Sequence, residues 1–243
     1  MTINRAATAL LVTALFPAGA TSISVLAAAP NAGIISGRVR LTGKPHGNPV
    51  IRMAVDPMCR KAAGGARRFN EIVLTDHDGG LANVFVKLQG TFPRTPVPPA
   101  PVTIDQRACT YIPRVVGARI GQVLEARNSD PLLHNVHSHS IGANTFNVGQ
   151  PVAGLVFRVP LKAETGMLRI SCDVHRWMTT YVGVVDHPYF AVTGRDGRFT
   201  IAGVPTGTYT LVSWHERYGE RTASVRVGRE GGATADLTYA GGA

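Results

Sequence analysis

The chain of 243 residues has few cysteines, few acidic residues and no sustained helical periodicity. Its three cysteines allow at most one disulfide, with one thiol left over. Only 15 acidic residues oppose 25 basic ones, so the formal charge is +10. The hydrophobic content of 44% is ordinary, and nothing in the composition indicates disorder. The chain is therefore long and apolar enough to bury a real core, divided between one larger and one smaller domain.

The first 29 residues predict a cleaved export signal. Arg5 carries their one charge, an apolar run follows over residues 6–16, and small residues close the segment. A membrane anchor is the alternative, but Pro17 and Gly19 break the run short of the roughly 20 apolar residues that a spanning helix needs. We expect a periplasmic protein with no stable membrane insertion after signal cleavage.

The basic charge persists when the signal is removed. Without Arg5 the chain keeps 24 basic and 15 acidic residues, a formal charge of +9. This balance favours acidic partners or anionic surfaces, although a solvated basic surface without a specific docking patch is the simpler interpretation. We expect no nucleic-acid partner, because the protein is exported and has no dense basic run beyond Arg67 and Arg68.

Short segments of alternating polarity predict an all-β protein. In the segment GIISGRVRLTG, Ile35, Val39 and Leu41 face one way and the intervening polar residues face the other. Similar patterns recur at residues 84–89, 122–127, 155–159, 167–171 and 181–185. A short helix is expected near residues 60–63. Short strands at such spacing are typical of antiparallel sandwiches or barrels.

Composition places a domain boundary near residue 188. The proline-dense segment 91–102 is expected to be an extended surface loop. After residues 186–189 the chain becomes a series of alternating strands joined by turns at Asp196-Gly197 and at 205–207. We therefore expect a signal peptide over 1–29, one domain over 30–187 and a small β domain over 188–243.

Two motifs bring together the residue types of a copper site. The segment SCDVHRWM supplies Cys172, His175 and Met178 directly after a strand, and NSDPLLHNVH supplies His134 in a turn-like setting. A thiolate, two imidazoles and a weak thioether are what a trigonal type 1 copper site with an axial methionine requires. Since Cys172 alone has a metal-ligand setting, we hypothesise that Cys59 and Cys109 form a disulfide and leave it free.

These motifs resemble the cupredoxin family, with the short C-x2-H-x2-M loop of its amicyanin-like members. The resemblance covers residues 115–186 and implies a Greek-key sandwich that holds one copper ion. It implies that His134 comes from the sandwich core and that Cys172, His175 and Met178 come from one loop. It further implies that the backbone amide of Asn135 contacts the Cys172 sulfur. His175 would be the ligand nearest the surface and therefore the electron port.

The C-terminal segment DGRFTIAGVPTGTYTL resembles the carboxypeptidase regulatory-like domains, which are small transthyretin-like sandwiches. The first strand, GRVRLTG, also looks like the opening strand of that family. The cupredoxin part is thus either a separate first domain or an insertion into the second. The cluster Trp214-His215-Glu216 is expected to serve packing and hydrogen bonding.

The favoured function is a periplasmic protein that carries single electrons. The alternative is a periplasmic copper carrier or buffer, and a scaffold with an incidental metal site is a third interpretation. We expect no enzyme, because a copper nitrite reductase would need a second cupredoxin domain or a partner subunit. His137 and His139 could bind a second metal, but are expected to be surface or supporting residues. Trp177 is expected either in the core or in an apolar docking rim.

Overall fold

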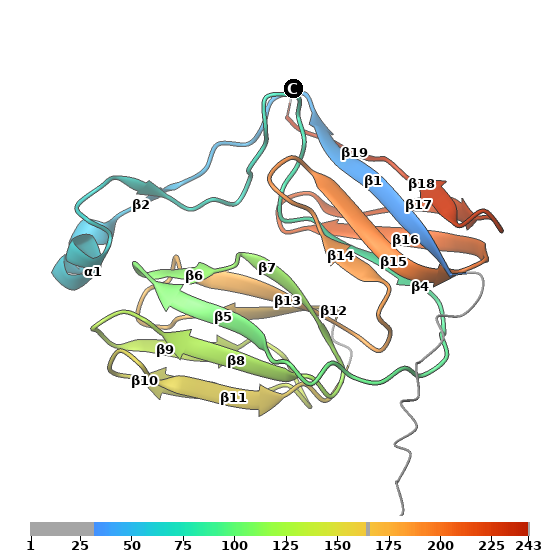
Figure 1. Ribbon diagram of the computed structural model, residues 1–243. Helices are drawn as coiled ribbons and strands as arrows, with labels where there is room; N and C mark the ends of the chain where they lie inside the picture. The colour runs from blue at the N-terminus through green and yellow to red at the C-terminus, as the bar shows by residue number, and fades with distance from the viewer. Residues whose placement is uncertain (1–31, 164–165, 243) are drawn as a thin grey trace, which may run out of the picture.

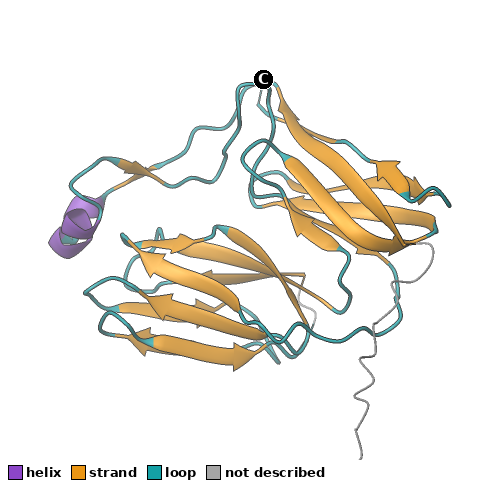
Figure 2. Cartoon of the chain, in the orientation of Figure 1, coloured by secondary structure: helices purple, strands orange, loops and turns teal. Residues whose placement is uncertain are grey.

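The structure is a computed structural model that describes residues 32–163 and 166–242. The predicted export signal lies outside the described residues. Almost all regular elements are strands, as Figure 2 shows, so the predicted all-β class is confirmed. Within the described part of the chain, no helix is long and apolar enough to cross a membrane.

The strands form two β-sandwiches (Figure 1). The framework sandwich is built from both ends of the described chain. Its first sheet has the order β15 (Arg198–Pro205), β1 (Ala32–Thr42) and β18 (Gly232–Thr234), and β19 (Leu237–Ala240) also pairs with β1. Its second sheet has the order β14 (Phe190–Val192), β4 (Phe85–Gln89), β16 (Gly207–His215) and β17 (Gly219–Val227). Alternate apolar side chains from both sheets fill the core between them.

The inserted sandwich comprises residues 102–185. One sheet has the order β10 (Asn147–Gln150), β9 (His134–Ser138), β12 (Gly166–Ser171), β13 (Thr179–Val185) and β7 (Val115–Arg119). The other has the order β11 (Val156–Pro160), β8 (Val123–Asn128), β5 (Val102–Arg107) and β6 (Thr110–Ile112). The proline-dense segment before Val102 forms no strand, as expected.

The arm, residues 44–80, leaves the framework sandwich between β1 and β4 and reaches one end of the inserted sandwich (Figure 1). It contains β2 (Val50–Ile51), the 3-10 turn η1 (Met53–Val55), α1 (Pro57–Ala62) and β3 (Arg68–Phe69). The carboxylate of Asp56 caps α1 by accepting the amides of Met58 and Cys59, and Pro57 occupies the first turn. The predicted helix is confirmed, and this cap makes it begin earlier than expected.

Strand pairing corrects the expected division near residue 188. β1 and β4 lie before that point, yet they pair with β15, β16, β18 and β19 from beyond it. Strand pairing therefore favours an insertion of β5–β13 between β4 and β14. The expected turns at Asp196-Gly197 and at 205–207 are present, but they connect strands of opposite sheets and not hairpins.

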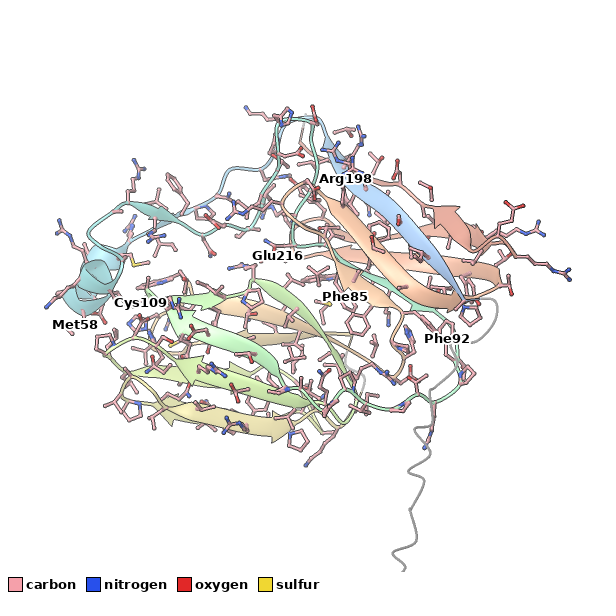
Figure 3. The ribbon with its side chains drawn as sticks, in the orientation of Figure 1. Met58, Phe85, Phe92, Cys109, Arg198 and Glu216 are labelled. Atoms are coloured by element: carbon pink, nitrogen blue, oxygen red, sulfur yellow. A yellow bond between two sulfur atoms is a disulfide. The ribbon has the colours of Figure 1, made fainter. Side chains whose placement is uncertain are left out.

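The two sandwiches pack against each other through apolar and charged contacts. Phe85 of β4 lies at the junction and packs with Val115 of β7 and Val185 of β13 (Figure 3). The ring leaves no room for a side chain at position 183, since a Cβ added to Gly183 would lie 2.5 Å from Phe85 Cζ. Beside it, Arg114 of the inserted sandwich donates two hydrogen bonds of 2.6 Å to the carboxylate of Glu216, between β16 and β17. These contacts fix the orientation of the sandwiches.

Candidate metal site

The ends of three strands bring the predicted ligands to one edge of the inserted sandwich. His134 begins β9, and Cys172 follows directly on β12, the antiparallel neighbour of β9. The loop after Cys172 is short, and the pairing of β12 with β13 begins directly at its two ends. Inside it, the Met178 amide donates to the His175 carbonyl and the Cys172 amide to the Met178 carbonyl. A compact loop of this kind leaves its side chains little conformational freedom.

Three donor atoms converge at this edge of the inserted sandwich. The Nδ1 atoms of His134 and His175 lie 3.0 Å apart, and Cys172 Sγ lies 4.0 Å from the first and 3.8 Å from the second. A point equidistant from all three lies about 2.1 Å from each, which fits the roughly 2.0–2.3 Å bonds of imidazole nitrogen and thiolate sulfur to a metal such as zinc. The exposed fractions of the three residues are 0%, 2% and 1%. The three donors are thus shielded from bulk solvent, and their spacing fits a metal ion.

Carboxylates orient both imidazole rings. His134 Nε2 bonds to Asp130 Oδ2 at 2.9 Å, and His175 Nε2 bonds to Asp56 Oδ2 at the same distance. Asp130 is itself fixed by the amides of Ala108 and Cys109. A carboxylate on one ring nitrogen keeps the proton there and leaves the other nitrogen free to bind metal. Both Nδ1 atoms consequently face Cys172.

The electrostatics of the site favour a thiolate. Burial by itself raises the pKa of the Cys172 thiol, but hydrogen bonds from His134, His175 and the Asn135 amide outweigh burial and lower this pKa to about 6. Burial disfavours the charged form of His134, yet Asp130 and the Cys172 thiolate raise the pKa of that imidazole to about 9. Charges of opposite sign thus stabilise each other in the buried cluster, and a metal cation can replace the imidazole proton.

Backbone contacts to the sulfur follow the expected pattern. The Asn135 amide lies 3.5 Å from Cys172 Sγ, as the family resemblance implied. The Asn135 side chain holds the loop as well, accepting the Asp173 amide and donating to the Asp173 carboxylate. The buried Tyr111 hydroxyl donates to the Asn135 carbonyl at 2.6 Å. The segment after His134 is therefore fixed from two sides.

Met178 lies in the core at the end of the same loop and is fully buried. Its role as axial ligand stays a prediction. Methionine packs readily in apolar cores, so burial by itself does not distinguish a ligand from a packing residue.

The arm covers the side of the site that was expected to be open. The hypothesised disulfide between Cys59 of α1 and Cys109 of the β5–β6 turn is present, and Cys172 is free. The disulfide sulfurs lie within 4.8 Å of a ring nitrogen of His175, whose other partner is Asp56 of the same arm. Of the candidate ligands His175 has the largest exposed fraction, but this fraction is only 2% because α1 and its capping carboxylate cover the ring, and its role as electron port stays a prediction.

His137 and His139 are brought together beside the site but bind other groups. Their rings stack with centroids 4.6 Å apart, His137 pairs with Asp173, and His139 bonds to the Ser171 hydroxyl. Within residues 32–163 and 166–242, the groups of three closely spaced metal donors include neither histidine. The two other groups contain disulfide-bonded cysteines, which offer no thiolate.

Sequence reasoning missed both carboxylates of the site. Asp130 lies four residues before His134, a spacing that is visible in the sequence but not specific. Asp56 precedes a proline at the start of a short helix, which is a capping signal. That signal predicts the cap and not the contact to a histidine 119 residues away.

Comparisons with known proteins return solved structures only. No protein-family model matches the chain. No curated protein matches it either. Similar structures include a copper-containing nitrite reductase from Thermus scotoductus SA-01 (18% identity, TM-score 0.34, 40% of this chain) and a purple cupredoxin from Nitrosopumilus maritimus (22%, 0.31, 34% of this chain and 98% of that one). An amicyanin variant in its Cu(I) form matches at 15% identity with TM-score 0.32, over 41% of this chain and 98% of that one. The chain spans 25% of the nitrite reductase. Similarity at this level carries no conclusion about activity.

Proposed function

We propose that the protein is a type 1 copper protein that carries single electrons between redox partners. The observation that supports this most is the convergence of His134 Nδ1, His175 Nδ1 and Cys172 Sγ around a point about 2.1 Å from each. Two imidazoles and one thiolate are the equatorial donor set of blue-copper centres, and Met178 would supply the weak axial ligand. Copper bound there would supply a one-electron couple, Cu(I) and Cu(II).

The surrounding residues favour such a couple because they restrict movement. Asp130 and Asp56 hold the imidazole rings, and the Asn135 amide holds the sulfur. Ligands that are fixed in advance change position little when the charge at the site changes. Exclusion of water from the buried donors removes a further source of reorganisation.

A copper carrier or buffer is the second candidate. A carrier must release its ion, and release is easiest from donors that solvent and competing ligands can reach. Here all three donors are buried, and the arm is fastened over them by a disulfide. Burial therefore favours retention, and with it electron transfer.

The remaining parts of the proposal concern the cell. We propose a periplasmic location after removal of residues 1–29, and redox partners that complement the basic charge of the chain. The disulfide agrees with an oxidising compartment. We propose an electron carrier and not an enzyme, since all three donors would bind the same copper ion.

The test is the visible absorption and electron paramagnetic resonance spectrum of the mature protein with Cu(II), beside Cys172→Ser. We expect an intense thiolate-to-copper band that is lost in the variant, and reversible reduction and reoxidation in voltammetry. A pale spectrum that is the same in both proteins would contradict the proposal. Rapid loss of copper to a modest chelator would favour the carrier.

A further inference from the structure

The covered position of His175 raises the question of how electrons would reach the site. Its ring is 2% exposed, and both nitrogens are occupied, one facing the donor cluster and one bonded to Asp56. The neighbouring aromatic ring is Trp177, whose centroid lies 5.3 Å from that of His175. Trp177 is only half-buried, and its indole N–H donates to the Cys109 carbonyl at 2.9 Å. Trp177 therefore connects the buried site with the surface.

Trp177 lines a groove of about 620 Å³ that is open to solvent. Its walls come from three parts of the chain: the arm, the loops of the framework sandwich, and the β6–β7 end of the inserted sandwich. In Figure 1 this is the side of the inserted sandwich that faces the arm. The volume lies in the range of pockets that hold small molecules, roughly 300–1,000 Å³.

Apolar side chains in the groove are left uncovered. Phe69 of β3 and Ile112 of β6 both line it, and they are 48% and 51% exposed. With Trp177 they supply aromatic and apolar surface, Phe69 from the arm and the other two from the inserted sandwich. Such surface favours a planar, conjugated ligand, since aromatic rings pack best by stacking or edge contact.

The charges of the residues that line the groove do not sum to zero. Four arginines line it against one carboxylate, Glu71. Arg114 is neutralised by Glu216, which lies outside the groove. The other three, Arg67, Arg68 and Arg195, form no ion pair among the described residues; Arg67 lies over the Phe69 ring. The groove therefore carries uncompensated positive charge beside aromatic surface, and guanidinium groups both pair with anions and stack on conjugated ligands.

We propose that this groove binds a small, planar, conjugated organic anion, and that this anion is the electron carrier that meets the protein beside Trp177. The second half of the proposal rests on the proposed electron-transfer function; the first half does not. A hydroquinone that carries a carboxylate group would give one electron to each of two oxidised protein molecules. It would release two protons to the water of the open groove and leave as the quinone.

The binding test uses copper-free protein with its disulfide intact, and naphthalene-2-sulfonate as a redox-inert probe in calorimetry. We expect saturable binding of one probe per chain, with a shift of the Trp177 indole N–H resonance, which Trp177→Phe identifies. Arg68→Glu with Arg195→Glu should weaken binding at least tenfold. The matched control, Arg226→Glu with Arg229→Glu, changes the net charge equally on exposed residues outside the groove and should alter binding less than twofold.

Several results would overturn the binding site. They are no saturable binding, equal weakening in both double variants, or inorganic sulfate binding as tightly as the probe. Stronger competition by a hexaglutamate peptide than by the probe would make an acidic protein segment the occupant and contradict the small-molecule proposal.

The two proposals fail separately. A thiolate-to-copper band without probe binding would overturn the groove and leave the copper site. Probe binding without that band would keep the groove as an anion site and remove the electron carrier from the proposal.

Discussion

Removal of the disulfide should destabilise the protein and release the arm from the candidate metal site. The test variant replaces Cys59 and Cys109 together by serine, so that no unpaired thiol remains to react with Cys172. The disulfide joins positions 50 residues apart. The entropy of closing a loop of that length in the unfolded chain corresponds to about 4 kcal/mol at 25 °C. The expected loss is roughly 2–4 kcal/mol, because native-state relaxation reduces the effect below the loop-closure value.

The lower part of that range applies if the arm detaches before the sandwiches unfold. In the variant, the hydrogen bond between Asp56 and His175 would still connect the arm to the candidate ligands. A partly detached arm gains entropy in the native state, and this offsets some of the loss in the unfolded state. The extent of detachment therefore decides where in the range the measured value falls.

Urea denaturation followed by circular dichroism measures the global loss, and limited trypsin digestion measures detachment, since the arm carries exposed sites at Arg60, Lys61 and Arg67. We expect faster cleavage of the arm in the variant. The control replaces the exposed arm residues Val55 and Met58 by serine and should stay within about 0.5 kcal/mol of the parent protein. An unchanged denaturation midpoint together with unchanged cleavage would refute the assignment of the disulfide as the fastening of the arm.

Three further predictions concern the framework sandwich and its junction. Burial, assisted by the nearby Arg114 charge, lowers the pKa of His215 to about 4. Because the unfolded chain binds this proton more readily, stability is lost as pH falls from about 6.5 towards 4, by about 3 kcal/mol; His215→Phe should flatten this part of the pH dependence in urea denaturation. Glu216→Gln leaves Arg114 without its carboxylate and should cost about 2–4 kcal/mol; a double-mutant cycle with Arg114→Gln that shows no coupling would contradict this. Gly183→Ala pushes a methyl group into the Phe85 ring and should lower the denaturation midpoint by the equivalent of about 1–3 kcal/mol, partly restored by Phe85→Leu.

The candidate ligands could be predicted because their signal is local. Cys172, His175 and Met178 occur within seven residues after an alternating strand pattern, and His134 begins the neighbouring strand. Alternation with period two likewise located most long strands, since it depends on the pleat alone and not on the partner strand. The structure adds the convergence of three donor atoms, while the role of Met178 stays a prediction.

Partners distant in sequence could not be predicted in the same way. Alternation shows that residues 32–42 form a strand, but β1 pairs with β19, almost 200 residues later, as in Val39 opposite Leu237. Nothing near β1 specifies that partner, and the change of composition near residue 188 indicates a boundary there instead. The contact of Asp56 with His175 could not be predicted for the same reason. An aspartate that caps a helix already accepts backbone amides, so the local sequence does not indicate a further contact.

The insertion has a consequence for how the site is assembled. His134, Cys172 and His175 belong to the inserted sandwich, whereas Asp56 and Cys59 belong to an arm whose two ends enter strands of the framework sandwich. The framework sandwich closes only when β1 has met β18 and β19 from the end of the chain. Correct placement of the arm over His175 therefore depends on both sandwiches, while convergence of the donors depends on one. A mutation that loosens the framework should therefore weaken the cover of the arm over the His175 ring, with the disulfide left as its attachment, before it changes the distances between the three donor atoms.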